Sequence, residues 1–133
     1  MAHAHIQAEP DKTGVKLIVR IAGFPNDRGS AGIALWKAPR GFPEDIEHAI
    51  RTIYVSIHNH TATTTFEGVA PGIYAVTVLH DQNDNRKFDK NPLGIPREAW
   101  GVSGNVRPRM RAPRFAEARF RLEKDLAIDI RVR

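Results

Sequence analysis

Short runs of alternating apolar and polar residues recur along the chain. In residues 15–21 the odd positions are apolar, and in residues 126–132 the even positions are apolar. Successive side chains point to opposite faces of a β-strand, so this period of two predicts strands with one buried face. The same pattern predicts further strands at 33–36, 53–57, 63–66, 73–79 and 118–122. The predicted core includes Leu17, Val19, Val76, Val78, Phe120, Ile128 and Ile130.

The order of these elements predicts an all-β fold. Turn-forming residues separate the seven strands, and no strand–helix–strand pattern occurs. Residues 43–50 begin with proline and two acidic residues, which favours one short helix there. We therefore expect a seven-stranded antiparallel β-sandwich, of immunoglobulin-like or transthyretin-like type, formed as a single domain by residues 14–133. Residues 1–13 are expected to be a flexible or assembly-related segment.

A long connection follows the predicted strand 73–79. Residues 93–96 and 100–102 are apolar but interrupted by glycine and proline, so we expect an ordered loop there and no strand. Connections of this length in compact domains usually serve a function or need a constraint.

The start of this connection carries oxygen-bearing side chains at regular intervals. Asp81, Asn83, Asn85 and Asp89 take positions 1, 3, 5 and 9 of an EF-hand-type calcium loop, and Lys87 at position 7 would supply its backbone carbonyl. Calcium takes six to eight oxygen ligands, and alternate side chains in a tight turn can supply several. The pattern predicts a calcium ion in the loop 81–89.

The loop departs from the full calcium motif at two positions. Arg86 stands where the motif has glycine, and Pro92 stands where it has the bidentate glutamate. Glu98, on the returning chain, is the nearest candidate for the missing carboxylate. The alternative is a polar surface turn, since Asn and Asp also favour turns.

Composition limits the available chemistry. The chain has 133 residues, no cysteine and a net charge of +5. Disulfides, thiolate metal sites and a cysteine nucleophile are therefore excluded. Arg107, Arg109, Arg111 and Arg114 form a basic segment without a nucleic-acid-binding motif, so we expect them to be exposed and to have no nucleic-acid role. No apolar run is long enough for a transmembrane span.

Other candidate chemistry is weak. His58 and His60 could share a face of a strand end, but zinc needs further ligands. His80 stands beside Asp81 without a nucleophile, and Ser103 lacks the G-x-S-x-G context of a hydrolase. We therefore expect a protein that is not an enzyme.

Several segments together resemble the bacterial domain-of-unknown-function 2141 family. They are residues 71–76, 80–85, 89, 93–98 and 100–103, followed by Phe115 and Ala118. The resemblance extends from about Val15 to Val132. It implies a secreted or periplasmic transthyretin-like or immunoglobulin-like sandwich with no established activity. Family loops carry glycine where Arg86 stands, and family members carry a signal peptide. Residues 1–10 have no apolar signal core, so we expect either a cytosolic protein or, with this family, a chain that starts after a removed signal.

Three functions remain open at this point. The first is a non-enzymatic extracytoplasmic module, extracellular or periplasmic, that holds a calcium ion in the loop 81–89. The second is a subunit of an extracellular filament or surface assembly, joined through strand edges and the N-terminal segment to itself or to a cell-surface partner. The third is a carbohydrate-binding or ligand-binding periplasmic domain that uses Trp36, Trp100 and the arginine segment.

Overall fold

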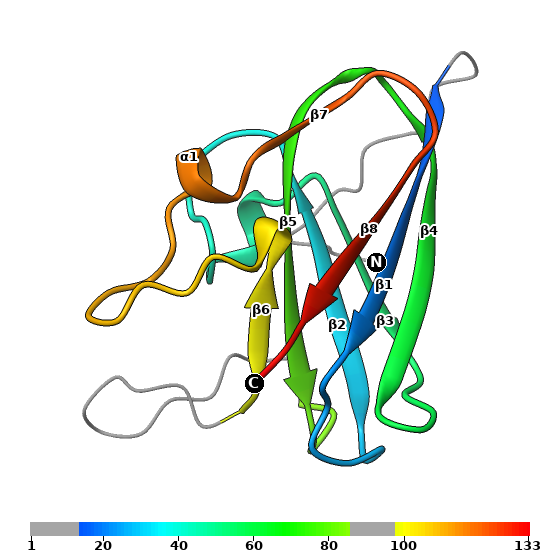
Figure 1. Ribbon diagram of the computed structural model, residues 1–133, viewed down its shortest axis with the longest axis vertical. Helices are drawn as coiled ribbons and strands as arrows, with labels where there is room; N and C mark the ends of the chain where they lie inside the picture. Colours follow the sequence, from blue (N-terminus) through cyan, green and yellow to red (C-terminus); the bar gives the residue numbers. More distant parts are fainter. Residues whose placement is uncertain (1–13, 86–97) are drawn as a thin grey trace, which may run out of the picture.

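The computed structural model describes residues 14–85 and 98–133, which form two β-sheets packed face to face (Figure 1). The three-stranded sheet has the order β4 (Thr61–Val69), β1 (Val15–Ala22) and β8 (Leu126–Arg131). The five-stranded sheet contains, in order, β3 (Arg51–Val55), β2 (Ser30–Trp36), β5 (Gly72–Asp81) and β6 (Trp100–Val102), with β7 (Phe120–Leu122) paired to the start of β5. The predicted sandwich is confirmed.

The prediction of a fully antiparallel sandwich is wrong at one strand pair. β1 and β8 run parallel, in register from Leu17 opposite Leu126 to Ala22 opposite Arg131. An alternating pattern shows which residues share a face, but it carries no information about strand direction. The Lys16 backbone N–H donates to the Asp125 carboxylate at 2.9 Å, which ties the start of β8 beside the start of β1.

The expectation of a loop at 100–102 is also wrong, because these residues form the short strand β6. Three residues are too few to show a period of two. Trp100 and Arg133 exchange backbone hydrogen bonds of 3.0 and 3.2 Å, so the C-terminus lies beside β6, as Figure 1 shows. A Cβ atom at Gly101 would lie 2.6 Å from the Arg131 carbonyl oxygen, so glycine permits this close approach between the two sheets.

One short helix is confirmed, but at a different place. It is α1 (Phe115–Ala118), whereas the segment 43–50 forms only a 3-10 turn, η1 (Ile46–His48). A second 3-10 turn, η2 (Ser103–Asn105), follows β6 directly. Single turns of helix are decided by tertiary contacts, since isolated helices of this length are unstable in water.

The main core lies between the two sheets. It contains five of the seven predicted core residues as fully buried side chains: Leu17, Val19, Val76, Val78 and Ile130. The other two, Phe120 and Ile128, are only partly buried and pack against this core. Alternation therefore predicted the buried face correctly, and burial is incomplete on the short strand β7 and on the edge strand β8.

A second apolar cluster lies on the outer face of the five-stranded sheet. Trp36 is fully buried there, its ring 5.3 Å from Phe42, which in turn packs edge-on against Phe115 at 5.9 Å. The Trp36 indole N–H donates to the Thr77 hydroxyl at 2.9 Å. Thus two connections, around Phe42 and around α1, fold over one end of this face.

Candidate functional site: a groove on the outer sheet face

The remaining part of the outer face forms the floor of a groove. Strand register places Tyr54, Gly32, Leu79 and Trp100 in one row across β3, β2, β5 and β6. The neighbouring row on the same face consists of Thr52, Ala34, Thr77 and Val102. All eight residues line one cavity of about 1190 Å³.

The floor is hollow because its central side chains are small. Gly32 and Ala34 occupy β2, where the alternate positions Ile33 and Leu35 fill the core on the inner face. The Tyr54 ring lies across Gly32, and a Cβ atom there would be 2.8 Å from Tyr54 Cε2. The Tyr54 ring therefore covers Gly32, and Leu79 stands between it and Trp100 in the same row.

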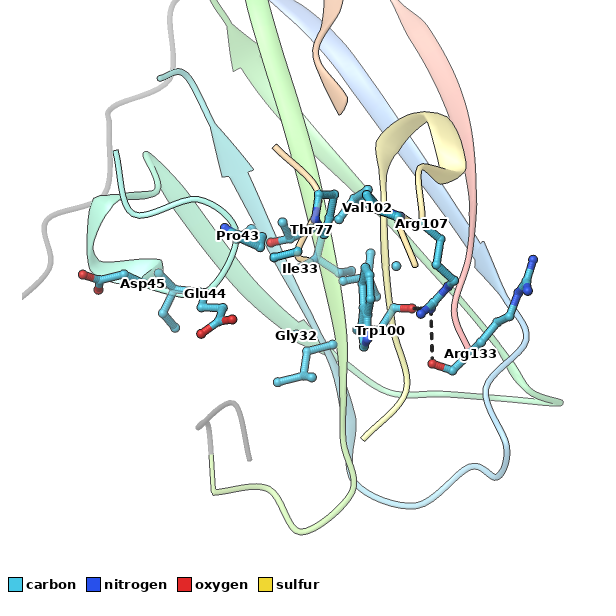
Figure 2. Close-up of a pocket in the computed structure, with 18 of the residues that line it drawn as sticks. Gly32, Ile33, Pro43, Glu44, Asp45, Thr77, Trp100, Val102, Arg107 and Arg133 are labelled. Atoms are coloured by element: carbon cyan, nitrogen blue, oxygen red, sulfur yellow. Dashed lines mark hydrogen bonds between the residues drawn. The ribbon is translucent and has the colours of Figure 1, made fainter. Parts of the chain in front are cut away.

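Charged segments of opposite sign form the two walls. Glu44, Asp45 and Glu47 line one side, whereas residues 107–113 and Arg133 line the other. Figure 2 shows Glu44 and Asp45 across the floor from Arg107. An apolar floor with charged groups at its borders is typical of a ligand-binding site.

Arg107 and Trp100 form a fixed pair on the basic wall. The Arg107 guanidinium lies 3.9 Å from the centre of the Trp100 ring. Its Nη2 donates to the Trp100 carbonyl and, at 3.3 Å, to the Arg133 carbonyl, as drawn in Figure 2. Burial lowers the pKa of Arg107, and the nearby positive charge of Arg133 lowers it further.

An ion pair anchors the rest of the basic wall to α1. Arg111 donates to both carboxylate oxygens of Glu117, at 2.7 and 2.9 Å, and the Arg114 backbone N–H donates to the same carboxylate at 2.9 Å. These contacts lower the pKa of Glu117 to about 2. The positive charge of Arg111 is therefore already matched.

The predicted exposure of the arginine segment is confirmed at three positions. Arg109, Arg111 and Arg114 are exposed, but Arg107 is half-buried against Trp100, so the prediction is wrong there. A guanidinium that stacks on an indole ring loses exposure without losing its charge. No sequence pattern links Trp100 to Arg107, since their contact depends on the turn η2 between them.

The predicted calcium residues lie at the end of β5. Asp81 is fully buried, and its Oδ1 accepts the Asn85 backbone N–H at 3.1 Å. The Asn83 side-chain oxygen lies 3.3 Å from the same N–H. Glu98 Oε2 accepts the Gln82 backbone N–H at 2.7 Å, so the returning chain does bring Glu98 to the loop.

The complete ligand set stays a prediction. Lys87 and Asp89, like Arg86 and Pro92, lie outside the described residues. Within residues 14–85 and 98–133, no group of three or more His, Asp or Glu side chains is arranged to hold a metal ion. A calcium loop also uses asparagine and backbone carbonyl oxygens as ligands.

Residues around the turn at 58–61 have structural roles. The Asp27 carboxylate accepts the backbone N–H groups of Asn59 and His60, at 2.9 and 2.8 Å, and this lowers its pKa. His60 Nδ1 lies 2.7 Å from the Phe24 carbonyl oxygen, to which it can only donate. These contacts fit the prediction that His58 and His60 belong to a strand end.

Ser103 and Trp36 are both used inside the fold. The Ser103 hydroxyl donates to the Ala118 carbonyl at 2.6 Å and accepts the Val76 N–H at 3.0 Å. Trp36 is completely buried, so its suggested place on a sugar-binding surface is wrong. Trp100 is half-buried and does line the groove.

Taken together, the chain is a β-sandwich module with a charged-walled groove on one sheet face. The family model described as "Uncharacterized protein conserved in bacteria (DUF2141)" matches residues 19–129, so the chain belongs to this family. No curated protein matches, and no solved structure matches. No helix among the described residues is long and apolar enough to cross a membrane.

Proposed function

We propose that this protein is a non-enzymatic, extracytoplasmic ligand-binding module, and that the groove on its five-stranded sheet holds the ligand. The observation that carries the proposal is the cavity of about 1190 Å³ over a floor that carries Tyr54 and Trp100. This volume exceeds the roughly 300–1,000 Å³ of small-molecule pockets, which favours an elongated ligand. The location outside the cytoplasm is an expectation from the family resemblance.

Packing supports a binding role for this face. The same outer face carries a buried aromatic cluster at one end, where Phe42 and Phe115 cover Trp36. The groove lies directly beside this cluster: Ala34 and Thr77 are buried at that end, whereas Gly32 and Leu79 are only partly buried. A concave, largely apolar surface bordered by charged groups is a typical place for a ligand.

A groove-filling variant tests this proposal. Leu79→Phe adds bulk on the half-buried Leu79 position of the floor. Ile53→Phe is the matched control, because Ile53 is 36% exposed and does not line the groove. Both variants and the wild-type chain would be screened against an oligosaccharide array and a peptide library. We expect a wild-type signal that Leu79→Phe removes and Ile53→Phe keeps. A signal that survives Leu79→Phe, or no signal from either library, would overturn the proposal.

A second candidate function is calcium binding at the loop 81–89, alone or together with the groove. It is favoured by the convergence of the Asp81 and Asn83 oxygens on the Asn85 N–H, with Glu98 beside Gln82. Asp81, Asn83, Asn85, Asp89 and Glu98 would supply side-chain oxygens, and Lys87 would supply its carbonyl. Such an ion would stabilise the long connection after β5 without taking part in chemistry.

Calcium binding is tested by calorimetry and thermal unfolding. Without the motif's glycine and bidentate glutamate, affinity should be in the extracellular range, with Kd on the order of 10⁻⁴–10⁻³ M. Calcium should raise Tm because it binds the folded chain, and magnesium should raise it less. Asp81→Asn keeps an acceptor oxygen for Asn85 but removes the charge, so it should reduce the shift. Asp45→Asn should not, since Asp45 lies on the groove wall. Absence of both binding heat and stabilisation at millimolar calcium would leave the loop as a polar turn.

The assembly-subunit alternative depends partly on residues 1–13, which lie outside the described residues. It stays a prediction, and concentration-dependent light scattering of the full chain checks it.

A further inference from the structure

We propose that the ligand of the groove is an acidic oligosaccharide, whose sugar rings stack on Trp100 and Tyr54 and whose carboxylate lies against Arg107 and Arg109. This inference rests on the proposed function of the groove. Four features of the described residues support it: the nature of the floor, its length, the basic wall and the acidic wall.

The floor of the groove presents side chains to a ligand, and this sheet face has no open row of backbone hydrogen-bonding groups. The backbone groups of β2 are shared with β3 on one side and with β5 on the other. At β6, the Trp100 N–H and carbonyl are bonded to Arg133. A peptide that adds a strand needs an open sheet edge, and the floor is a sheet face. Recognition in the groove therefore depends on ring faces and charged side chains.

Trp100 offers one of those ring faces. Arg107 stacks on one side of the indole, 3.9 Å from the ring centre. In Figure 2 Arg107 and the acidic segment lie on opposite sides of Trp100, so the second face of the ring looks into the groove. An aromatic ring held in place from behind provides a rigid, largely apolar platform for a sugar ring.

The spacing of the two aromatic rings favours a chain of sugars. Tyr54 and Trp100 stand in the same row on β3 and β6, which are separated by three strand intervals. The Tyr54 ring lies across Gly32 on β2, so about two intervals of roughly 4.8 Å, about 10 Å in all, separate it from Trp100. A ligand that touches both rings must be longer than a single sugar ring, in agreement with the volume of the groove.

The basic wall has hydrogen-bond donors and positive charges that the described residues do not match. Arg107 makes both of its hydrogen bonds through Nη2, so its Nε and Nη1 donors make none with the described part of the chain. Arg109 and the side chain of Arg133 have no carboxylate partner among these residues, in contrast to Arg111 with Glu117. A bound carboxylate would offset the mutual repulsion of Arg107 and Arg133, which contributes to the lowered pKa of Arg107.

The acidic wall argues against a polyanion that is charged throughout its length, such as a nucleic acid. Glu44, Asp45 and Glu47 line the groove opposite the arginines, and a phosphate backbone across the floor would meet them. Sugar hydroxyls, by contrast, can donate to carboxylates. A saccharide with carboxylates at intervals matches both walls.

The experiment compares a short oligogalacturonate with its methyl-esterified form, which has the same rings without the charge. Titration calorimetry at physiological salt should show binding of the acid and at least about tenfold weaker binding of the ester. Arg109→Gln should weaken binding of the acid by about tenfold while leaving the ester unchanged. Arg107→Gln should weaken binding of the acid at least as much, and binding of the ester less, because Arg107 also holds the Trp100 ring in place. Trp100→Leu should weaken both. Arg119→Gln is the matched control, because this substitution removes the same charge. Arg119 is exposed and does not line the groove.

Three outcomes would overturn the inference. Equal binding of acid and ester would exclude recognition of charge, and an equal loss with Arg119→Gln would show only general attraction to a basic protein. Failure of the oligogalacturonate to bind would also overturn it. The proposed function would survive that last outcome if a peptide or a neutral sugar bound and Leu79→Phe abolished the signal. Because Arg107 holds two carbonyls, Arg109→Gln keeps the test valid should Arg107→Gln unfold.

Discussion

The inner and outer faces of the five-stranded sheet are built from alternate residues of the same strands, yet they are packed very differently. On the inner face Ile33 and Val78 are at most 2% exposed and belong to the core between the sheets. On the outer face their neighbours Gly32 and Leu79 are only half-buried and line the groove. The same backbone thus carries a filled face and an open one.

This difference separates stability from binding. Large branched side chains on the inner face bury apolar area, which stabilises the fold by roughly 25 cal/mol per Å². Small residues on the outer face bury little apolar area. The aromatic cluster around Trp36 covers only one end of that face. Substitutions should therefore affect the two faces unequally, and the following predictions test that in order of expected size.

Truncation of the inner face should have the largest effect. Ile33→Ala removes a 1%-exposed side chain from the main core and should lower the free energy of unfolding by roughly 2–5 kcal/mol. Leu79→Ala is the matched truncation on the outer face and should cost clearly less, because Leu79 is only partly buried. Urea unfolding of both variants measures the difference. Equal costs would mean that the two faces do not differ in their contribution to stability.

Loss of one polar contact on the outer face should have a smaller effect. Thr77→Val keeps the shape of the side chain but leaves the buried Trp36 indole N–H without its 2.9 Å acceptor. Leaving such a donor unsatisfied should cost about 1–3 kcal/mol. Thermal unfolding followed by tryptophan fluorescence checks this. Thr63→Val, at an exposed position of β4, is the control and should change stability little.

Addition of a single methyl group to the floor of the groove should lower the free energy of unfolding by a still smaller amount. Gly32→Ala places a Cβ 2.8 Å from Tyr54 Cε2, so the ring must shift. Overpacking of this kind costs ~1–3 kcal/mol, and the entropy gained by replacing a strand glycine offsets ~0.5–1 kcal/mol. A net loss of about 1 kcal/mol is expected, together with a changed Tyr54 ring environment by NMR. An unchanged Tyr54 spectrum would contradict the described floor.

Acid should loosen the basic wall while the inner core stays packed. Hydrogen bonds from Arg111 and Arg114 lower the pKa of Glu117 from 4.5 to about 2. A carboxylate whose pKa is depressed in the folded state adds stability above its unfolded pKa, and this is lost as pH falls from about 4.5 to about 2. An NMR titration should show Glu117 and residues 107–113 changing together in this window. In the Glu117→Gln variant, the NMR signals of residues 107–113 should not change over this pH range. If they still change, another group is responsible for the titration.

The elements with long periodic patterns could be predicted from the sequence, and the short ones could not. The strand at 15–21 and the last strand were evident from alternation, and both match β1 and β8. β6 and α1 contain only three and four residues, too few for a period to appear. Their structure depends on contacts with Arg133 and with the sheet face, which lie far away in sequence.

The candidate site shows the same limit. The order Asp81, Asn83, Asn85 pointed to a cation, and Glu98 was correctly expected near this loop, because the residues are close in sequence. The sequence also suggested Trp100 and the arginine segment, together with Trp36, as parts of one ligand-binding surface. Neither the stacking of Arg107 on Trp100 nor the opposing acidic segment 43–47 could be inferred, since strand register and the paths of two connections bring them together.

By itself, the amino-acid sequence determined that this protein is a two-layered β-fold and which residues form its inner face, since side-chain alternation is a local property of a strand. It also identified the DUF2141 family, to which the chain belongs. Only the tertiary structure decided that β8 runs parallel to β1 and that Gly32, Leu79 and Trp100 stand in one row on the floor of the groove. Strand direction and cross-strand register arise from contacts between distant segments, and a pattern within one segment carries no record of them.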